Sequence, residues 1–441
     1  MKGVFKLTRV LVLIFVLIFA SCAFADTVTV SGYSELAAAL SNVSADTIII
    51  SGDIEVEDTL KIERSVALKG RGVSSQDDPK PVLKMKTKGS ASVIDCEGSK
   101  MKILLQGLTI SDGNGGLAIN LVQYVSFDIE NCIFVDNELT DGISYGGAIK
   151  AMGLVDLNIK DSIFRRNSSG NNGGAIYLVV GANANIERCT FIDNQADRYG
   201  GAIYVNGMCA LNLTNCTFTG NTAGNGRPGG GLYVDGTANI INCTFVNNSA
   251  KRGAEIATGD FDDNIKIQAA NSIFYNESAS NYIKLNKGSI SLYNCAYSSG
   301  DVLVGAVKTE NCIADLNWAG REATPVEPVN GLPVFRLVTG NTEDEKLIDK
   351  GLAAGEVKTK LELDFTPNIS IDEESATRSG LPDIGAKESV SGENIGGNSE
   401  DGTNGENATS SHGSSGGCGM SFNALSLLAL SLISLSFKRS R

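Results

Sequence analysis

Apolar and polar residues alternate over short segments that recur along the middle of the 441-residue chain. Four of these segments consist of an apolar residue, an asparagine and a second apolar residue: Leu157-Asn158-Ile159, Ala184-Asn185-Ile186, Leu211-Asn212-Leu213 and Ala238-Asn239-Ile240. Alternation over so few residues is typical of a β-strand with one buried face, and a helix would space its apolar positions differently. The pattern therefore predicts short strands that recur at a regular spacing.

Each of these strands precedes a short string in which a phenylalanine is followed three residues later by an asparagine. The phenylalanines are 30, 27, 27, 27 and 29 residues apart, at Phe134, Phe164, Phe191, Phe218, Phe245 and Phe274. The asparagines are Asn137, Asn167, Asn194, Asn221 and Asn248, and Glu277 takes the sixth position. A spacing of this size predicts an array of stacked repeats.

A second string, Gly-Gly-Ala-Ile, lies between the copies of the first. It ends at Ile149, Ile176 and Ile203, continues as Gly230-Gly231-Leu232, and is degenerate at 253–256. Glycine pairs permit a positive φ or a close approach of two backbones. We therefore expect this string to form a corner of the chain, followed by a buried strand.

Together these strings predict an all-β fold, a right-handed parallel β-helix or solenoid. A unit of about 27 residues cannot bury its own apolar face, but stacked coils of short strands can. Each coil would pair in parallel with the next at roughly 4.8 Å, so equivalent residues of successive repeats would form columns. We expect the phenylalanines and isoleucines to line the interior. The asparagines of the Phe-x-x-Asn string should bond one another at a turn.

Two further columns face outwards in this arrangement. One column precedes each phenylalanine by six residues and consists of Asn158, Asn185, Asn212 and Asn239. The other follows the glycine strings and consists of Tyr177, Tyr204 and Tyr233. Amides and aromatic rings can both bind sugars. We favour the structural interpretation, in which both columns stabilise the stacking of the coils.

The segments on either side of the clear repeats at 131–277 have signals of their own. Residues 33–40 predict a short helix with Ser34 as its N-cap, and this helix would cover the first coil. We expect coils throughout 26–317 and a C-terminal cap module at 318–388. The Gly/Ser/Asn-rich segment 389–417 predicts a flexible, disordered stalk.

Both ends of the chain carry targeting signals. Residues 1–25 have a basic start, an apolar run and a small-residue cleavage site ending at Ala25, which is the layout of a secretory signal peptide. Cleavage after Ala25 and lipidation at Cys22 are both compatible with this segment. Residues 418–441 predict a hydrophobic C-terminal helix with a basic cytoplasmic end. We therefore expect an exported protein, anchored to the membrane, in the cell envelope or on the outer surface.

The alternating Gly-Gly-Ala-Ile and Phe-x-x-Asn strings resemble the polymorphic outer membrane protein repeat of bacterial surface adhesins. The resemblance covers about residues 131–277 and implies a surface β-helix. Autotransporter members of that family end in a large barrel, for which this sequence has no room, so we expect another route to the surface. The Gly-Gly-Cys418 string, the apolar stretch and the basic end resemble the sorting signals of Synergistetes-type bacteria. That resemblance implies processing near Cys418.

Composition and charge exclude several functions. The formal net charge of −13 disfavours nucleic acid as a partner, because a phosphate backbone requires a basic face. The single histidine, His412, lies in the predicted stalk, so neither histidine catalysis nor a zinc site is expected. Four cysteines lie two residues before a phenylalanine and should stack inside as free thiols: Cys132, Cys189, Cys216 and Cys243.

The candidate acids are Asp193 and the loop acids Asp260, Asp262 and Asp263. They form no column across neighbouring coils, which a saccharide-cleaving site or a calcium site would need. We therefore expect no catalytic residue, no cofactor and no metal. The predicted function is that of a non-catalytic adhesin or surface-interaction protein, whose partner is a glycan or a protein of a host or neighbouring cell. The alternative is a polysaccharide lyase or hydrolase of the pectate-lyase-like β-helix type.

Overall fold

The computed structural model describes residues 26–316 with short gaps, together with 353–361 and 363; the gaps are 74–77, 88, 90, 99, 112–114, 140–144, 261, 278–281 and 299–302. The predicted signal peptide, stalk and C-terminal helix lie outside the described residues, as does most of the cap expected at 318–388. Over the described residues, no helix has the length and apolar character needed to cross a bilayer.

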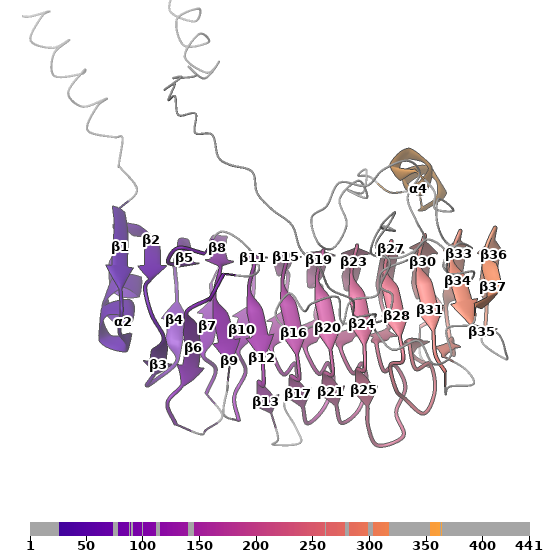
Figure 1. The fold of residues 1–441 in the computed structure, drawn as a ribbon, viewed down its shortest axis with the longest axis horizontal. Helices are drawn as coiled ribbons and strands as arrows, with labels where there is room; N and C mark the ends of the chain where they lie inside the picture. Colours follow the sequence, from indigo (N-terminus) through magenta and orange to yellow (C-terminus); the bar gives the residue numbers. More distant parts are fainter. Residues whose placement is uncertain are drawn as a thin grey trace, which may run out of the picture. The chain divides into compact units, whose positions relative to one another are not determined.

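The described chain is a parallel β-solenoid whose successive coils add strands to three long sheets (Figure 1). Sheet 1 has twelve strands: β1 (Asp26–Val30), β2 (Ala45–Ile50), β5 (Val66–Gly70), β8 (Met101–Gln106), β11 (Val125–Glu130), β15 (Asp156–Lys160), β19 (Asn183–Glu187), β23 (Ala210–Thr214), β27 (Thr237–Ile241), β30 (Lys266–Ala270), β33 (Ser289–Tyr293) and β36 (Val307–Glu310). Alternate residues of these strands are buried, such as Leu157 and Ile159 of β15, because successive side chains point to opposite faces.

Sheet 2 has eleven strands, and each follows a strand of sheet 1 in the chain. They are β3 (Ile54–Val56), β6 (Val82–Met85), β9 (Thr109–Ser111), β12 (Ile133–Val135), β16 (Ile163–Arg165), β20 (Thr190–Ile192), β24 (Thr217–Thr219), β28 (Thr244–Val246), β31 (Ile273–Tyr275), β34 (Ala296–Ser298) and β37 (Ile313–Leu316). From β12 onwards, the corner between sheet 1 and sheet 2 has one residue per coil with a φ between 49° and 56°: Asn131, Asp161, Arg188, Asn215, Asn242, Asn271, Asn294 and Asn311. Asparagine tolerates this left-handed region, which explains why it recurs there.

Sheet 3 has ten strands: β4 (Leu60–Ile62), β7 (Ile94–Glu97), β10 (Ile119–Val122), β14 (Ile149–Met152), β18 (Ile176–Val179), β22 (Ile203–Val205), β26 (Leu232–Val234), β29 (Ile256–Thr258), β32 (Ile283–Lys284) and β35 (Leu303–Val304). The corner before it requires both glycines of the Gly-Gly-Ala-Ile string. Gly200 has a φ of +69°, and a Cβ on Gly201 would lie 2.2 Å from the carbonyl oxygen of Gly230 in the next coil. A short sheet 4 comprises β13 (Glu138–Leu139), β17 (Ser168–Ser169), β21 (Gln195–Ala196) and β25 (Thr222–Ala223).

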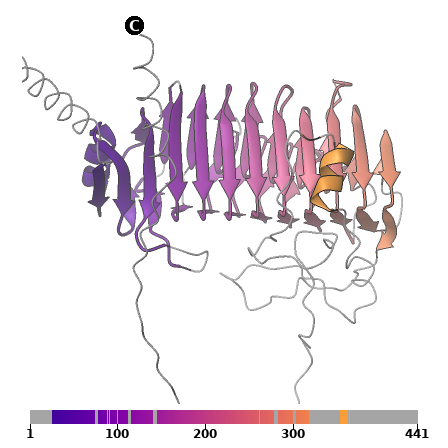
Figure 2. The ribbon, with the colours of Figure 1, turned by 90° about the horizontal axis from the view of Figure 1, so that it is seen from above.

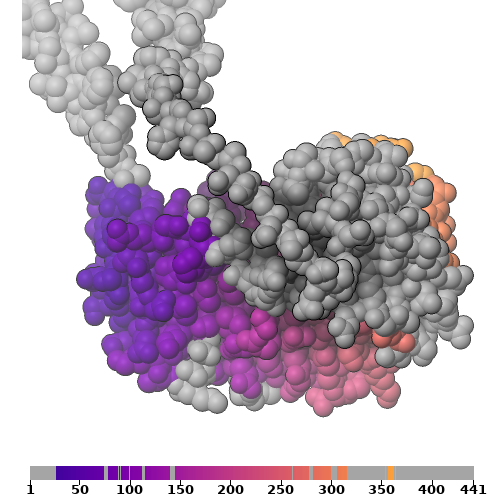
Figure 3. Space-filling model, in the orientation of Figure 1, coloured from indigo at the N-terminus to yellow at the C-terminus, as the bar shows by residue number. Residues whose placement is uncertain are grey.

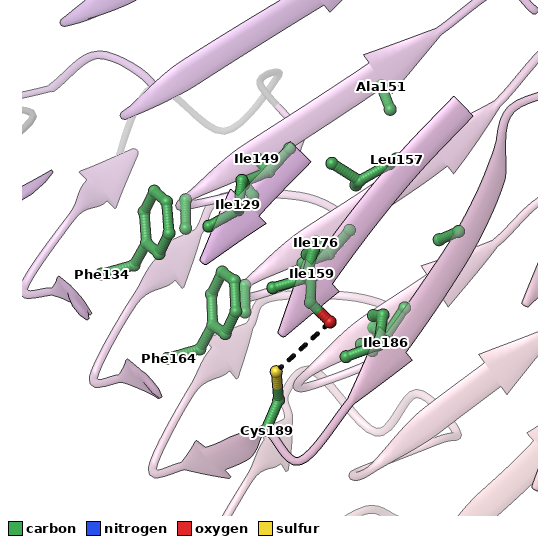
Figure 4. Close-up of a cluster of buried hydrophobic side chains, with 14 of the residues drawn as sticks. Ile129, Phe134, Ile149, Ala151, Leu157, Ile159, Phe164, Ile176, Ile186 and Cys189 are labelled. Carbon is green, nitrogen blue, oxygen red and sulfur yellow. Dashed lines mark hydrogen bonds between the residues drawn. The ribbon is translucent and has the colours of Figure 1, made fainter. Parts of the chain in front are cut away.

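The interior is filled by columns of equivalent residues. The six phenylalanines of the repeat, from Phe134 to Phe274, pair in register across sheet 2 and are fully buried. Neighbouring ring centroids are 4.5–5.3 Å apart. Ile149, Ile176 and Ile203 pair in register on sheet 3 and are also fully buried. Figure 4 shows the first two phenylalanines beside the first two of these isoleucines.

The asparagines of the Phe-x-x-Asn string form a buried internal Asn ladder, which comprises Asn137, Asn167, Asn194, Asn221 and Asn248. Each of the first four donates a side-chain N–H to the Oδ1 of the next at 2.8–2.9 Å. Each also donates to a backbone carbonyl of the preceding coil at 2.9–3.1 Å. The ladder therefore bonds the turns of neighbouring coils to one another through a region that water does not reach.

The internal Asn ladder ends on a buried carboxyl group. The side chain of Asn248 donates to Glu255, which occupies the alanine position of the degenerate glycine string. Asn276 donates to Glu255 Oε1 at 2.8 Å. Asn276 follows Phe274 by two residues, whereas the other ladder asparagines follow their phenylalanines by three. Burial raises the pKa of Glu255 to about 8, against the opposing effect of the Asn248 and Asn276 donors.

Helix α2 (Tyr33–Ser41) lies beside β1 and β2 at the N-terminal end of the sheets (Figure 1). Its buried residues join the hydrophobic core: Leu36, Ala39 and Leu40. The guanidinium group of Arg64 donates to four backbone carbonyls, two of them in the last turn of the helix. The N-cap is Gly32, so the prediction of Ser34 was wrong. The helix begins earlier because Glu35 accepts the Ser31 backbone N–H at 2.7 Å.

The eight described cysteines are free thiols. The four of the repeat are buried and fill the space beside the phenylalanine column. Cys189 illustrates their contacts: its thiol donates to the carbonyl oxygens of Glu187 at 3.3 Å and Ile159 at 3.8 Å (Figure 4). Burial raises the pKa of Cys132 to about 12, so these thiols act as small apolar side chains.

Candidate functional site

The outer face of sheet 1 carries a groove of about 560 Å³. Four successive strands contribute to it: β11, β15, β19 and β23. Its lining residues are Asp128, Ile129, Glu130, Asn158, Lys160, Asn185, Ile186, Glu187, Asn212 and Thr214. In Figure 2 these strands lie side by side in the middle of the solenoid. In Figure 3 the coils that are drawn in colour pack directly against one another, from indigo at the N-terminal end to magenta. The groove therefore runs across the coils rather than along one strand.

An outer Asn column forms the floor of this groove. It comprises Asn158, Asn185, Asn212 and Asn239, which pair in register on successive strands. Each of the last three donates a side-chain N–H to the Oδ1 of the preceding asparagine at 2.8–2.9 Å. Asn158 donates to Asp128 Oδ1 at 2.8 Å, so a carboxylate ends the column. The column thus bonds neighbouring coils to one another, and three of its members, Asn158, Asn185 and Asn212, line the groove.

Each inner amide of the outer Asn column keeps hydrogen-bonding capacity after these contacts. A primary amide has two N–H donors and an oxygen with two lone pairs. The contacts along the column use one N–H and one lone pair of Asn185 and of Asn212. Asn185 is exposed and Asn212 is half-buried, so the second N–H and the second lone pair are available at the groove surface.

Charged residues form a second column along the groove. Glu130, Lys160 and Glu187 occupy equivalent positions on β11, β15 and β19. Lys160 Nζ lies 3.5 Å from Glu187 Oε2, and Gln106 donates to Glu130 Oε2 at 2.8 Å. With Asp128, the lining therefore holds three carboxylates and one ammonium group, which makes the groove locally acidic.

The C-terminal end of this face is covered by helix α4 (Ala354–Leu361), which lies beside β30 (Figures 1 and 2). Val357 and Leu361 pack on an apolar patch of sheet 1 formed by Ile241, Ala270 and Tyr293. These three residues continue the column that contains Lys160 and Glu187. The outer face is therefore polar where it is open and apolar where the helix covers it.

An ionic contact secures the same helix. Lys360 is bonded to Glu310 and lies 5.8 Å from the ring centroid of Tyr293. Lys360 lowers the pKa of Glu310, because its ammonium group favours the ionised carboxylate. The apolar contact and this ion pair both fix the helix to the last strands of sheet 1.

The tyrosine column lies on sheet 3 and has a different geometry. The rings of Tyr177, Tyr204 and Tyr233 stack on one another with centroids 5.2 Å apart. Because the ring faces contact one another, they are not presented to a sugar ring. Tyr204 donates its hydroxyl to Asp235 at 3.1 Å, and burial raises the pKa of both groups.

The acids singled out from the sequence are not brought into the groove. Asp193 is exposed at a turn. Asp262 accepts two hydrogen bonds from Asn264, and Asp263 pairs with Lys287 at 2.8 Å. The described part of the chain contains no group of three histidine, cysteine or acidic side chains placed to hold a metal ion.

Sequence reasoning missed the acids that do line the groove. Asp128 precedes Phe134 by six residues, which is the spacing of the outer Asn column, so that spacing could have identified it. Glu130, Lys160 and Glu187 each precede a repeat phenylalanine by four residues, so the same argument could have placed them in one column.

Comparison with known proteins decides the handedness of the solenoid. A family model described as a right handed beta helix region matches residues 86–250. The fold is a right-handed parallel β-helix. The predicted fold class is confirmed to that extent.

Two solved structures are similar to the β-helix described here. ORF18 of Geobacillus virus E2 has a TM-score of 0.33 at 13% identity over 64% of this chain. Tailspike protein 3 of bacteriophage CBA120 has a TM-score of 0.24 at 14% identity over 70% of this chain. The chain spans 56% and 61% of the length of these two structures, respectively. No curated protein matches the chain.

Proposed function

We propose that this protein is an exported β-helix, anchored in the cell envelope, which binds a neutral glycan along the groove of sheet 1 without cleaving it. The observation that carries the proposal is the outer Asn column. It offers an unused amide N–H and an unused lone pair at each of two successive coils, Asn185 and Asn212. Sugar hydroxyls donate and accept hydrogen bonds, so they complement such a surface.

The spacing of the column also suits a polymer. Neighbouring strands of a sheet lie roughly 4.8 Å apart, so equivalent groups repeat along the solenoid axis. An extended chain that follows the axis can therefore make the same contact at several coils. Several weak contacts on one chain add to a useful affinity because each later contact is intramolecular.

The charges of the groove favour a neutral glycan over a polyuronate. Asp128, Glu130 and Glu187 outnumber the cations beside them, which are Lys160 in the lining and Arg188, which pairs with Glu187. A chain of uronic acids would meet repulsion from these carboxylates, whereas a neutral glycan can use them as hydrogen-bond acceptors.

The same acids support a second candidate function, polysaccharide cleavage by a lyase or hydrolase. Two carboxyl groups on either side of a glycosidic bond can serve as acid and base. Glu130 and Glu187 are two coils apart, and Lys160 lies on the coil between them. The ion pair and the hydrogen bonds that occupy these side chains favour a binding role.

The two functions are separated by following binding and product formation with the same glycans. The intact protein is incubated with neutral glycans and polyuronates, retention is measured by affinity electrophoresis, and released ends are assayed. The proposal expects retention by a neutral glycan with no new reducing or unsaturated ends. Release of ends that is lost in Glu130→Gln or Glu187→Gln would instead establish an enzyme.

The export and anchoring parts of the proposal rest on the two ends of the sequence. We expect a mature N-terminus after Ala25 and processing near Cys418. Mass spectrometry of the protein isolated from its own cells tests both positions. An unprocessed N-terminus starting at Met1, with the protein in the cytoplasmic fraction, would contradict export.

A further inference from the structure

A second surface outside the groove carries a column of cations. In three successive coils, the glycine that opens the corner before sheet 3 has a positive φ. A basic residue lies two positions before this glycine each time: Arg198, Arg227 and Lys251. They therefore occupy equivalent positions in three successive coils. The backbone agrees, because Lys251 N donates to Arg227 O at 3.3 Å. Arg252 follows directly and is exposed, as is Lys251.

Other charged positions of this solenoid pair opposite signs across neighbouring coils. Arg166 contacts Asp136 at 2.6 Å, and Arg188 contacts Asp161 at 2.7 Å. The basic column, defined as Arg198, Arg227, Lys251 and Arg252, differs from this pattern. Over the residues that the structure describes, none of its members forms an ion pair. The three loops that hold it are 197–202, 224–231 and 247–255. Their acids are Asp197 and the buried Glu255, against four cations, which leaves an excess of positive charge.

Tyr199 holds two of these cations close together. The guanidinium carbons of Arg198 and Arg227 lie 5.5 Å and 5.3 Å from the centroid of its ring. Arg227 also donates to the Tyr199 hydroxyl at 2.9 Å. Two like charges held at one ring repel each other, and like charges stacked across a ladder are unfavourable. A bound anion would offset this repulsion.

We propose that the basic column binds an anionic saccharide, one that carries sulfate or carboxylate groups along its chain. Successive coils place the cations in a row, and guanidinium groups bind sulfate and carboxylate through paired hydrogen bonds. Two observations disfavour a nucleic acid. The Tyr199 ring is occupied by guanidinium groups, so it cannot stack on a base, and the chain has a formal net charge of −13.

The experiment measures binding of the intact protein to dextran sulfate, with uncharged dextran and single-stranded DNA as comparison probes. The proposal expects binding to dextran sulfate that weakens as salt is raised, and at least tenfold weaker binding to the other two. The double variant Lys251→Gln/Arg252→Gln changes only exposed side chains and should lose at least tenfold in affinity. Adding Arg227→Gln should weaken binding further.

The matched control is Lys61→Gln/Lys102→Gln, which removes the same charge from two other exposed positions. Its affinity for dextran sulfate should stay within about twofold of the wild type, because nearby rather than distant charges dominate at physiological salt. If both double variants lose the same affinity for dextran sulfate, the basic column is not the binding site. Binding of DNA as tight as that of dextran sulfate would overturn its assignment to a saccharide.

Discussion

Asparagine has three distinct roles in this solenoid, and its position in the coil decides which one applies. At the corner before sheet 2, Asn215 and its equivalents adopt a positive φ. In the internal Asn ladder, Asn194 is fully buried and bonds both neighbouring coils. In the outer Asn column, Asn185 is exposed and also bonds to the adjacent coil. The cost of losing an asparagine should therefore depend on its burial.

The first prediction compares an internal and an outer asparagine. Asn194→Ala leaves the buried Asn167 amide without its acceptor and the Phe164 carbonyl without a donor. We expect a loss of about 1–3 kcal/mol in the free energy of unfolding, because buried polar groups are left unpaired. Asn185→Ala is the control, and it should cost under ~1 kcal/mol because water replaces the lost contacts. Thermal unfolding of both variants checks this, and equal costs would contradict it.

The second prediction concerns the buried Glu255. Its pKa of about 8 in the folded protein lies above the ordinary value of 4.5, so the folded chain retains a proton that the unfolded chain releases. The stabilising contribution is complete below about pH 4.5 and is lost as the pH rises towards 8, by at most ~1.4 kcal/mol per pH unit. Glu255→Gln cannot ionise, so the melting temperature of this variant should fall less between pH 5 and pH 8.

The control for this prediction is Glu277→Gln, which removes a carboxyl group that is exposed. Its melting temperature should follow the wild-type dependence on pH. If Glu255→Gln and the wild type lose the same number of degrees between pH 5 and pH 8, Glu255 is not the titrating group.

At the residue scale, the positions that repeat in every coil could be predicted from the sequence. The residues at which a column ends could not. Spacing alone identifies the members of both asparagine columns. It does not show that Glu255, at a degenerate copy of the glycine string, provides the acceptor for the last ladder amide. Nor does it show that Asn276, rather than the residue at the expected spacing, joins the same carboxyl group. Such end positions depend on where the array stops, which only the folded chain reveals.

At the scale of elements, helix α4 is the feature that the sequence did not reveal. It lies within the segment expected as a C-terminal cap, but its docking site on sheet 1 required the strand register. The apolar patch of Ile241, Ala270 and Tyr293 belongs to the outer face, where alternation predicts polar residues. The strands of sheet 1 themselves were predictable, because their alternation is regular and short.

The third prediction tests the docking of this helix. Val357→Asp places a charge in the apolar contact with Tyr293 and should detach α4, since an unpaired buried charge is costly. Hydrogen exchange of residues 354–361, followed by mass spectrometry, should become at least tenfold faster. Thr359→Asp is the control, because Thr359 is exposed on the same helix, and its exchange should be nearly unchanged. Unchanged exchange in Val357→Asp would show that these contacts do not hold the helix.

At the scale of the whole molecule, stacked coils turn single side chains into linear surfaces. Three such surfaces are present on the described coils: an outer Asn column with mixed charges, a stacked tyrosine column and a basic column. The tyrosine faces are used within the structure, which leaves two surfaces for partners. The sequence predicted the right-handed parallel β-helix because repeats fix the register of every coil. The two-residue offset between the outer Asn column and the charged column also places both on one face. The sequence could not predict that this face forms a groove, because that depends on how the folded chain packs.

The central claim is that the groove of sheet 1 binds a glycan through the outer Asn column. Calorimetric titration with a neutral polysaccharide that the intact protein retains tests this claim most directly. The double variant Asn185→Ala/Asn212→Ala should bind at least tenfold more weakly than the wild type. The matched control is Asn183→Ala, an exposed position of the same strand whose equivalent in the next coil is Ala210. It should bind like the wild type, whereas wild-type affinity in the double variant would contradict the account.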